Sequence, residues 1–267
     1  MHLSKHHGLG NDFLVVLEAT NGPLPNSPDL ARALCDRHTG IGADGLIWGG
    51  VSDRADVAFR LHNADGTEAE ISGNGLRCLV QAHLRAAGLH EGTVTVATPG
   101  GVRQAVATAA SDPLTLSVLA EMGPVSAGPT LPAVVGEMGF AQAATGSVGN
   151  PHVVLLGAGS LVPDLTSIDL AKVGRRVEDA IPGGANVHVV ESVGPETLVM
   201  RSWERGVGLT EACGSGATVA AWVARTWGLV GDRVTVRMPG GEAVVELGET
   251  EASLGGRATF VADLETP

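Results

Sequence analysis

The chain has almost no aromatic side chains: it contains no Tyr, and aromatic residues make up 3% of its 267 residues. Apolar residues nevertheless account for 44% of the sequence, so a core of Val, Leu and Ala is expected. The length predicts one large domain or two smaller ones, because domains usually contain about 100–150 residues.

Basic side chains are also scarce. The chain has 17 Lys and Arg against 29 Asp and Glu, which gives a net charge of −12. Nucleic-acid binding requires a surface rich in Lys and Arg, so the composition argues against a nucleic-acid partner. A small anionic substrate remains compatible with it, because binding of such a substrate depends on the local site.

Cysteines are few and long hydrophobic runs are absent. Cys35, Cys78 and Cys213 show no CxxC spacing, which is typical of reduced thiols in a cytoplasmic protein. No segment approaches the ~20 consecutive apolar residues of a membrane helix, and no signal segment opens the chain. The sequence therefore predicts a soluble, cytoplasmic protein without a membrane partner.

Two motifs that could suggest a metal or a nucleotide lack the necessary context. His2, His6 and His7 are not accompanied by an HExxH motif or a cysteine cluster, so we predict no metal site. Residues Gly40–Gly45 read GxGxxG, but they follow a helical pattern and precede the predicted strand Leu46–Trp48. A dinucleotide site needs the opposite order, strand before helix, so no nucleotide cofactor is predicted.

Several short motifs occur twice in the same order, which indicates an internal duplication. The two copies of each are separated by 139 to 142 residues: Gly10–Val16 and Gly149–Leu155, Gly42–Asp44 and Gly184–Asn186, Phe59–Asn63 and Met200–Glu204, Val94–Gly101 and Val234–Gly241. Ser72 and Cys213 obey the same spacing, and each is followed by Gly-x-Gly and an apolar helical run.

Each copy has the pattern of one α/β (α+β) unit. Strands are predicted at 13–17, 46–48 and 57–62 and again at 152–156, 187–190 and 197–203. A helix capped by Ser27, with Pro28 as its first residue, is predicted in the first copy. The helix after Cys213 is apolar on almost every side, so we expect a curved sheet around it. The predicted lobes are residues 1–131 and 132–255, and the last strand, 256–267, could join the first lobe or equally close either one.

The turns at Ser72 and Cys213 carry the predicted chemistry. Free amides at a helix start bind anions, and the same field lowers the pKa of a thiol from ~8.5 to about 3.5–7.5. We therefore expect a thiolate at Cys213, whereas Cys35 and Cys78 are expected to be structural. Two opposed acid/base groups with two amide sites fit inversion at an α-carbon, where one group removes a proton and the other returns one.

At these residues the chain resembles the diaminopimelate epimerase family of the cofactor-independent epimerase and racemase superfamily. The resemblance implies two pseudo-symmetric lobes, each a curved, mostly antiparallel sheet around a central helix, with the active-site cleft between them. It implies an isomerase that needs neither pyridoxal phosphate nor a metal and interconverts LL- and meso-diaminopimelate for lysine and cell-wall synthesis. The matching segments are 7–13, 63–66, 73–78, 149–152, 185–186, 203–208 and 212–216.

The resemblance also implies a role for individual residues. Cys213 would be one acid/base, and Ser72 stands at the position of the second catalytic cysteine. His152 and Glu204 would tune the thiols, and Arg205 would pair with the distal carboxylate of the substrate. The residues implied to bind substrate are Asn11, Asn63, Gly73, Asn74, Asn150, Asn186, Glu204, Arg205, Gly214 and Ser215.

Three positions depart from the family pattern. Gly45 stands where many members have a substrate-contacting Gln, and Ala262 stands where many have a Tyr at the interface of a homodimer. The homodimer implied by the family is therefore left open. Ser72 is the most serious departure, because a hydroxyl ionises near ~16, like water, instead of near ~8.5, and is a poor general base.

The serine at position 72 leaves several hypotheses. It could be an engineered replacement of cysteine, or part of a natural Ser/Cys pair that resembles that of hydroxyproline epimerases and acts on another amino acid. A Cys213 nucleophile for acyl transfer is a rival enzyme class, although it gives no reason for the copied turn at Ser72. A two-lobed amino-acid binding protein without catalysis is the non-enzymatic alternative.

Overall fold

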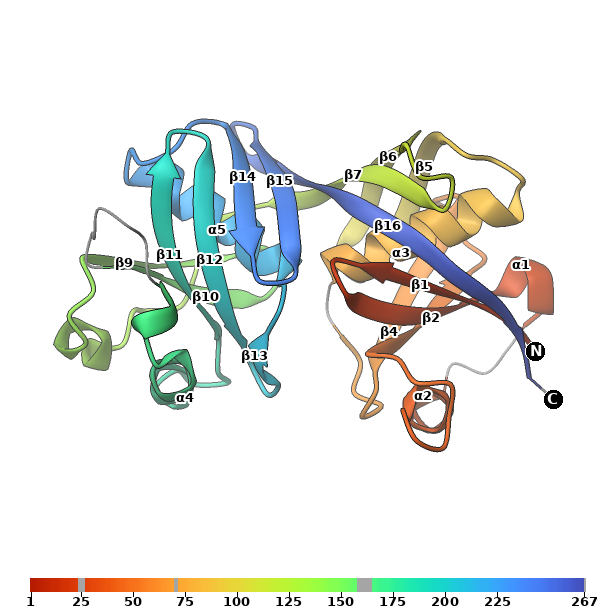
Figure 1. The fold of residues 1–267 in the computed structure, drawn as a ribbon, viewed down its shortest axis with the longest axis horizontal. Coiled ribbons are helices and arrows are strands. Elements are labelled where there is room, and N and C mark those ends of the chain that lie inside the picture. The colour runs from red at the N-terminus through yellow and green to blue at the C-terminus, as the bar shows by residue number, and fades with distance from the viewer. Residues whose placement is uncertain (24–26, 70–71, 158–164, 267) are drawn as a thin grey trace. The chain divides into compact units, whose positions relative to one another are not determined.

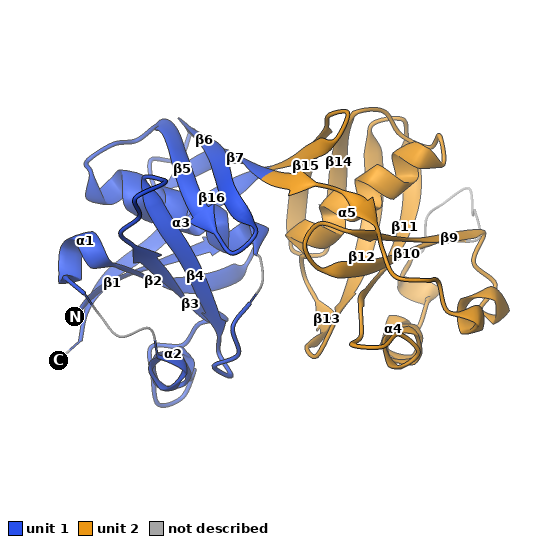
Figure 2. Ribbon diagram, turned by 180° about the vertical axis from the view of Figure 1, so that it is seen from behind, with its two compact units in different colours: residues 1–121, 255–267 blue, residues 122–254 orange. Residues whose placement is uncertain are grey.

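The computed structural model describes residues 1–23, 27–69, 72–157 and 165–266 (Figure 1). The chain forms two compact units, Met1–Glu121 with Gly255–Pro267 and Met122–Leu254 (Figure 2). The unit boundaries fall inside strands β7 (Thr115–Pro124) and β16 (Glu251–Glu265) instead of at the expected 131/132 position. The carboxyl-terminal segment belongs to the first unit.

In the first unit, eight strands form a closed barrel. They follow the order β1-β2-β3-β4-β5-β6-β7-β16, and β16 pairs again with β1. The β2–β3 and β4–β5 pairs run parallel, whereas the β16–β1, β1–β2, β3–β4, β5–β6 and β6–β7 pairs run antiparallel. The remaining strands are β1 (His2–Gly8), β2 (Asn11–Leu17), β3 (Gly45–Gly50), β4 (Val57–Asn63), β5 (Gly92–Thr98) and β6 (Gly101–Ala109).

The second unit repeats this pairing pattern. Its strands follow the order β15-β14-β12-β11-β10-β9-β8, and β13 pairs with β12. The parallel pairs are β10–β11 and β12–β14, at the places that correspond to the parallel pairs of the first unit. The strands are β8 (Ser126–Ala127), β9 (Gln142–Ser147), β10 (Pro151–Leu156), β11 (Asn186–Gly194), β12 (Thr197–Glu204), β13 (Gly208–Thr210), β14 (Arg233–Met238) and β15 (Gly241–Leu247).

One long helix lies against the concave side of each sheet. Helix α3 (Gly73–Ala86) contacts strands β1 to β6, and α5 (Gly214–Thr226) contacts β9, β10, β11, β12, β14 and β15. Small side chains such as Ala217, Ala220 and Ala221 are fully buried on α5, so the strands can approach it closely. The predicted fold class, a curved and mostly antiparallel sheet around a central helix, is confirmed.

The ends of the helices follow local sequence signals. Helix α2 (Pro28–Cys35) begins with Ser27, whose Oγ accepts a hydrogen bond from the Leu30 amide at 3.4 Å, as predicted. Gly88 and Gly228 lie one residue beyond the C-caps of α3 and α5 with φ of 71° and 72°. This left-handed conformation favours glycine and ends both helices.

The remaining helices are short. They are α1 (Glu18–Asn21), α4 (Leu170–Asp179) and two 3-10 segments, Ala133–Glu137 and Leu165–Ser167. The segment Ala133–Glu137 follows directly after the predicted boundary between the two copies. Across the described residues, no helix has both the length and the apolar character needed to span a membrane.

Candidate active site

Ser72 and Cys213 are the N-cap residues of α3 and α5, and their backbones match. Ser72 has φ −141° and ψ 113°, and Cys213 has φ −131° and ψ 108°. The Ser72 hydroxyl accepts a hydrogen bond from the Gly75 amide at 3.0 Å, which caps α3. The Cys213 side chain does not cap α5. The duplication thus places both residues at the same point of each unit, but their side chains are used differently.

The environment of Cys213 favours its protonated thiol. Its side chain is buried, with 3% of the residue exposed, and burial raises the pKa of the thiol well above its usual value. The neighbouring Glu204 carboxylate raises the pKa further, while the Gly216 amide and the Ser215 hydroxyl act in the opposite direction. The prediction that the helix start lowers this pKa is therefore wrong, because desolvation of the thiolate outweighs the helix amides.

Glu204 is the carboxylate that faces this thiol. It is the last residue of β12, and burial raises the pKa of its carboxyl group, whereas a hydrogen bond with Cys213 lowers it. A thiol and a carboxyl group that are both reluctant to ionise lie in hydrogen-bond contact. When Glu204 is ionised, it can accept the proton that the thiol gives up.

A series of hydrogen-bonded polar side chains, buried except for the half-buried Asn150, leads away from the start of α5. Asn150 Nδ2 donates to Ser215 Oγ at 3.5 Å, and Ser215 Oγ lies 3.7 Å from Cys213 Sγ. Asn150 Oδ1 lies 2.8 Å from Nε2 of His152. His152 is therefore linked to the thiol through Asn150 and Ser215.

The series of hydrogen bonds continues to His188 and Ser202, two residues that the sequence did not single out. Nδ1 of His152 lies 2.9 Å from Nε2 of His188, whose Nδ1 lies 2.9 Å from Ser202 Oγ. Burial lowers the pKa of His188 to about 3, and burial, with the nearby His188 imidazole and the charge of Arg205, lowers the pKa of His152 well below its ordinary value. Both imidazoles are neutral. A histidine inside the apolar run Val187–Val190 was the signal that could have identified His188.

Asn186 and Arg205 lie at the same edge of the second unit. Asn186 pairs with His152 in the β10–β11 register, and its Nδ2 donates to the carbonyl of Pro151 at 3.3 Å. Its Oδ1 accepts from the Arg205 amide at 2.9 Å, and the Arg205 guanidinium donates to the carbonyl of Gly183 at 3.3 Å. The second unit therefore groups seven of the predicted side chains: Asn150, His152, Asn186, Glu204, Arg205, Cys213 and Ser215.

The first unit groups its own candidates around the start of α3. Asn74 Nδ2 donates to Asn11 Oδ1 at 3.2 Å, just as Asn150 contacts Ser215 in the other unit. Asn63, at the end of β4, donates to Thr67 Oγ1 at 3.0 Å. Each unit therefore holds the asparagine of its Gly-Asn turn against the second residue of its central helix.

Position 45 has no room for a longer side chain. A Cβ atom on Gly45 would lie 2.8 Å from the backbone oxygen of His62 and 2.8 Å from a Leu61 methyl group. The departure from the family's Gln is thus built into the packing of β3 against β4. Position 45 therefore differs from the family pattern in two ways: the Gln side chain is missing, and the neighbouring backbone leaves no space for one.

Within the described part of the chain, the other thiols and the amino-terminal histidine His6 form no hydrogen bond with the candidate groups described above. Cys35 and Cys78 are buried, and burial raises the pKa of each thiol to about 12, which agrees with a structural role. Buried His6 contacts Gln81 and Ser4, and burial lowers its pKa to about 4. Among the residues that the structure describes, no group of His, Cys, Asp or Glu is arranged to hold a metal.

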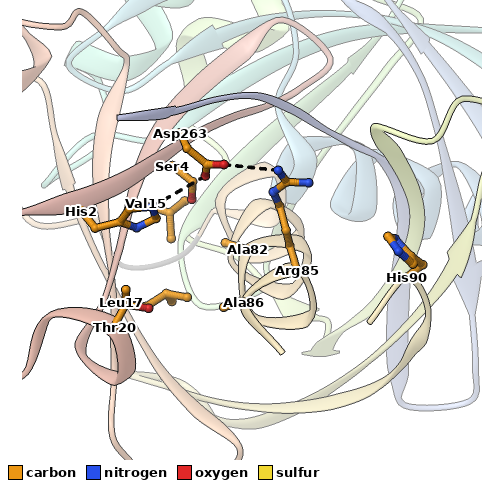
Figure 3. Close-up of a pocket in the computed structure, with 10 residues that line it drawn as sticks. All are labelled: His2, Ser4, Val15, Leu17, Thr20, Ala82, Arg85, Ala86, His90 and Asp263. Atoms are coloured by element: carbon orange, nitrogen blue, oxygen red, sulfur yellow. Dashed lines mark hydrogen bonds and ion pairs between the residues drawn. The ribbon is translucent and has the colours of Figure 1, made fainter. Parts of the chain in front are cut away.

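A hollow of about 390 Å³ on the first unit is separate from these groups (Figure 3). Arg85 and His2 point toward Asp263 there, at 3.2 and 4.0 Å. The hollow contains none of the candidate catalytic or substrate-binding residues. Its lining residues are His2, Ser4, Val15, Leu17, Thr20, Ala82, Arg85, Ala86, His90 and Asp263.

Solved structures establish the class of fold. The phenazine biosynthesis protein of the PhzF family from Bacillus anthracis superposes with a TM-score of 0.74 at 16% identity, over 100% of this chain and 99% of that one. A hydroxyproline epimerase from Agrobacterium vitis gives a TM-score of 0.72 at 16% identity, over 100% and 90%. The chain thus has the two-unit fold shared by these proteins.

Sequence comparison identifies the family. The family model of diaminopimelate epimerase matches residues 3–127 and 145–261. Diaminopimelate epimerases from Desulfitobacterium hafniense and Desulforudis audaxviator are 35% and 39% identical, covering 93% and 92% of this chain and 92% and 91% of their own. The chain belongs to the diaminopimelate epimerase family, whose members are isomerases.

Proposed function

We propose that this chain interconverts LL- and meso-diaminopimelate by proton transfer at one α-carbon, with Cys213 and the residue at position 72 acting on opposite faces of that carbon. The observation that carries this proposal is the matched pair of helix starts, each with an acid/base position followed by free amides. The amides of Gly73, Asn74, Gly214 and Ser215 would bind the reacting carboxylate and stabilise the negative charge that develops on it.

The protonation state of Cys213 suggests its role. Because burial and Glu204 keep its proton in place, Cys213 is set to donate that proton to the carbanion. To act as a base in the reverse direction, Cys213 must first lose the proton, and Glu204 is the group in contact that can accept it. Glu204 and His152 would thus tune the thiol, directly and through Asn150 respectively.

The hydroxyl at position 72 limits the rate. To remove the α-proton, Ser72 must first pass its own hydroxyl proton to another group, and its oxygen already accepts from the Gly75 amide. A positioned acid/base contributes about 10²–10⁴ to a rate. We therefore expect the chain with Ser72 to be slower than its Ser72→Cys variant by a factor in this range.

The remaining residues would hold the rest of the substrate. Asn11, Asn63, Asn150, Asn186 and Glu204 would contact its polar groups, and Arg205 would pair with its distal carboxylate. A location in the cytoplasm fits the three free cysteines. The acyl-transfer alternative is disfavoured, because a nucleophilic thiol needs a lowered pKa and Cys213 has a raised one.

The test is incubation of each diaminopimelate isomer in heavy water, followed by chromatography and mass spectrometry. Ser72→Cys should incorporate deuterium at the α-carbon and equilibrate the two isomers, and Cys213→Ala in the same background should abolish both. If Ser72→Cys neither exchanges nor epimerises diaminopimelate, the substrate assignment fails. Unchanged exchange after Cys213→Ala would refute the mechanism.

A related reaction on another amino acid is the second candidate. The closed packing at Gly45 and the hydroxyl of Ser72 favour it, because both alter the surroundings of the family's substrate. In that case the unmodified chain should exchange the α-hydrogen of another amino acid, such as 4-hydroxyproline, faster than that of diaminopimelate. The same heavy-water assay with the two substrates distinguishes the candidates.

A further inference from the structure

Arg77 is a fully buried cation in the middle of helix α3. Its side chain is 0% exposed, and its Nη2 donates to Oδ1 of Asn74, one turn earlier on the helix. Its Nε and Nη1 have no hydrogen-bond partner among the described residues. The corresponding residue of the second unit is Thr218, whose hydroxyl donates to the Gly214 carbonyl at 3.0 Å. The duplication therefore does not explain the arginine.

A buried guanidinium without a carboxylate partner is costly to desolvate, and unpaired buried donors are uncommon. Burial lowers the pKa of Arg77 to about 10, which leaves it charged at neutral pH. The fold also makes room for it: a Cβ atom on Gly256 would lie 2.9 Å from its Cζ. Gly256 of β16 thus leaves the space that the Arg77 guanidinium of α3 occupies.

The hydrogen bonds that start at Arg77 have only one consistent direction. Arginine can only donate, so the atom of Asn74 that faces it is the amide oxygen. The Asn74 amide nitrogen then donates to Oδ1 of Asn11 at 3.2 Å, and Nδ2 of Asn11 donates to Oδ2 of Asp44 at 2.7 Å. The Asp44 carboxylate can only accept, so the other end of this series of hydrogen bonds requires the same direction.

We propose that Arg77 is a positioning residue: as an obligate donor opposite the obligate acceptor Asp44, it fixes the amides of Asn74 and Asn11 in a single orientation for substrate binding. This proposal rests on the proposed function only in assigning Asn11 to the substrate and the start of α3, around Asn74, to the reacting carboxylate. A Gln at position 77 could present either its oxygen or its nitrogen to Asn74, so it would not impose the direction. A neutral apolar side chain would leave the Asn74 amide oxygen without a donor, so Asp44 alone would hold the orientation of the two amides.

The kinetic test uses the Ser72→Cys protein as the parent. Arg77→Met should lower kcat/KM for diaminopimelate about tenfold, the equivalent of one hydrogen bond, mainly by raising KM. Arg77→Lys, which is still only a donor, should restore most of this loss, and Arg77→Gln should restore less. In an Asn74→Ala background, Arg77→Met should have no further effect, because Arg77 acts through Asn74.

Two controls separate positioning from folding. Replacing a buried charge with an apolar side chain often leaves a protein stable, so urea unfolding of Arg77→Met should show an intact fold. Gly256→Ala keeps the charge but displaces the guanidinium, and it should reproduce part of the rise in KM. A purely structural role would instead lower stability in both variants and leave KM unchanged.

A measurement that needs no catalysis keeps the two proposals distinguishable. In the Ser72 protein, the side-chain amide NMR signals of Asn74 and Asn11 should both shift in Arg77→Met and return toward their original positions in Arg77→Lys. If the Ser72→Cys parent is inactive on diaminopimelate, the proposed function fails, and the NMR result still decides the role of Arg77. Unchanged amide signals, or an unchanged KM in an active parent, would overturn the positioning role.

Discussion

Ser72 and Cys213 share one backbone conformation at the starts of α3 and α5, yet only the Ser72 side chain caps its helix. The same geometry that makes serine a good N-cap ties its oxygen to the Gly75 amide at 3.0 Å. The Cys213 thiol is not the cap of α5, and its sulfur lies against Glu204 and the Ser215 hydroxyl instead. The acid/base role and the capping role therefore compete for one side chain.

This competition predicts opposite effects on stability and chemistry. Ser72→Ala should lower the free energy of unfolding by about 1 kcal/mol, because the cap of α3 is lost. Cys213→Ser should keep or raise the stability, since a hydroxyl there can accept from the Gly216 amide. Urea unfolding measures both, and a clear loss of stability in Cys213→Ser would contradict the capping argument.

The reactivity of Cys213 should depend on Glu204. The carboxylate raises the pKa of the thiol, so Glu204→Gln should lower that pKa and increase the thiolate fraction at pH 8. Alkylation of Cys213 by iodoacetamide should then be faster, about tenfold for each unit by which the pKa falls. Peptide mass spectrometry gives the rate at each thiol, with buried Cys35 and Cys78 as internal controls. Equal rates in both proteins would show that Glu204 does not set this pKa.

The buried histidines should make the fold sensitive to mild acid. In the unfolded chain His188 binds a proton below its ordinary pKa of 6.5, but in the folded chain only below about 3. The unfolded state thus binds more protons between these values, so stability falls as the pH decreases through this range. Each such histidine adds a slope of about 1.4 kcal/mol per pH unit.

His188→Gln should remove one histidine's share of this slope. The measurement is urea unfolding of the original chain and the variant between pH 7 and pH 5. His152 contacts His188, so the difference in slope reports His188 together with any change at His152, while the other carboxyl and imidazole groups are common to both proteins. Parallel slopes would mean that His188 is not kept neutral by the fold.

Gly216 should tolerate no side chain while His188 lies beneath it. A Cβ atom at position 216 would be 2.3 Å from Cε1 of His188, so Gly216→Ala should cost about 1–3 kcal/mol of stability by overpacking. Gly75, the equivalent residue of α3, is a matched control, because its nearest neighbour would be 3.2 Å away. Gly75→Ala should cost less.

The double variant Gly216→Ala with His188→Ala completes this test. Removing the imidazole removes the clash, so the double variant should be more stable than the sum of the two single changes predicts. Urea unfolding of the four proteins gives the coupling. Additive losses would show that the two residues do not meet.

Local signals in the sequence were sufficient for the frame of this protein. The repeated motifs predicted two similar units, and the observed sheets have parallel pairs at corresponding places, β2–β3 with β10–β11 and β4–β5 with β12–β14. Ser27 as a cap and Gly88 and Gly228 as helix ends were also predictable. Each of these features depends on residues within four positions of one another or on a repeat that can be counted.

The electrostatic character of the site was decided only by the tertiary structure. The amides beside Cys213 are its sequence neighbours and suggested a thiolate, but burial and Glu204, nine positions earlier, keep the thiol protonated. His188 and Ser202 join the site because β10, β11 and β12 lie side by side, and Arg77 is buried because β16 closes the first barrel around α3. Desolvation is the sum of contacts from distant segments, so the pKa of Cys213 and the role of Arg77 follow from the folded chain, while the positions of the two helix starts follow from the sequence itself.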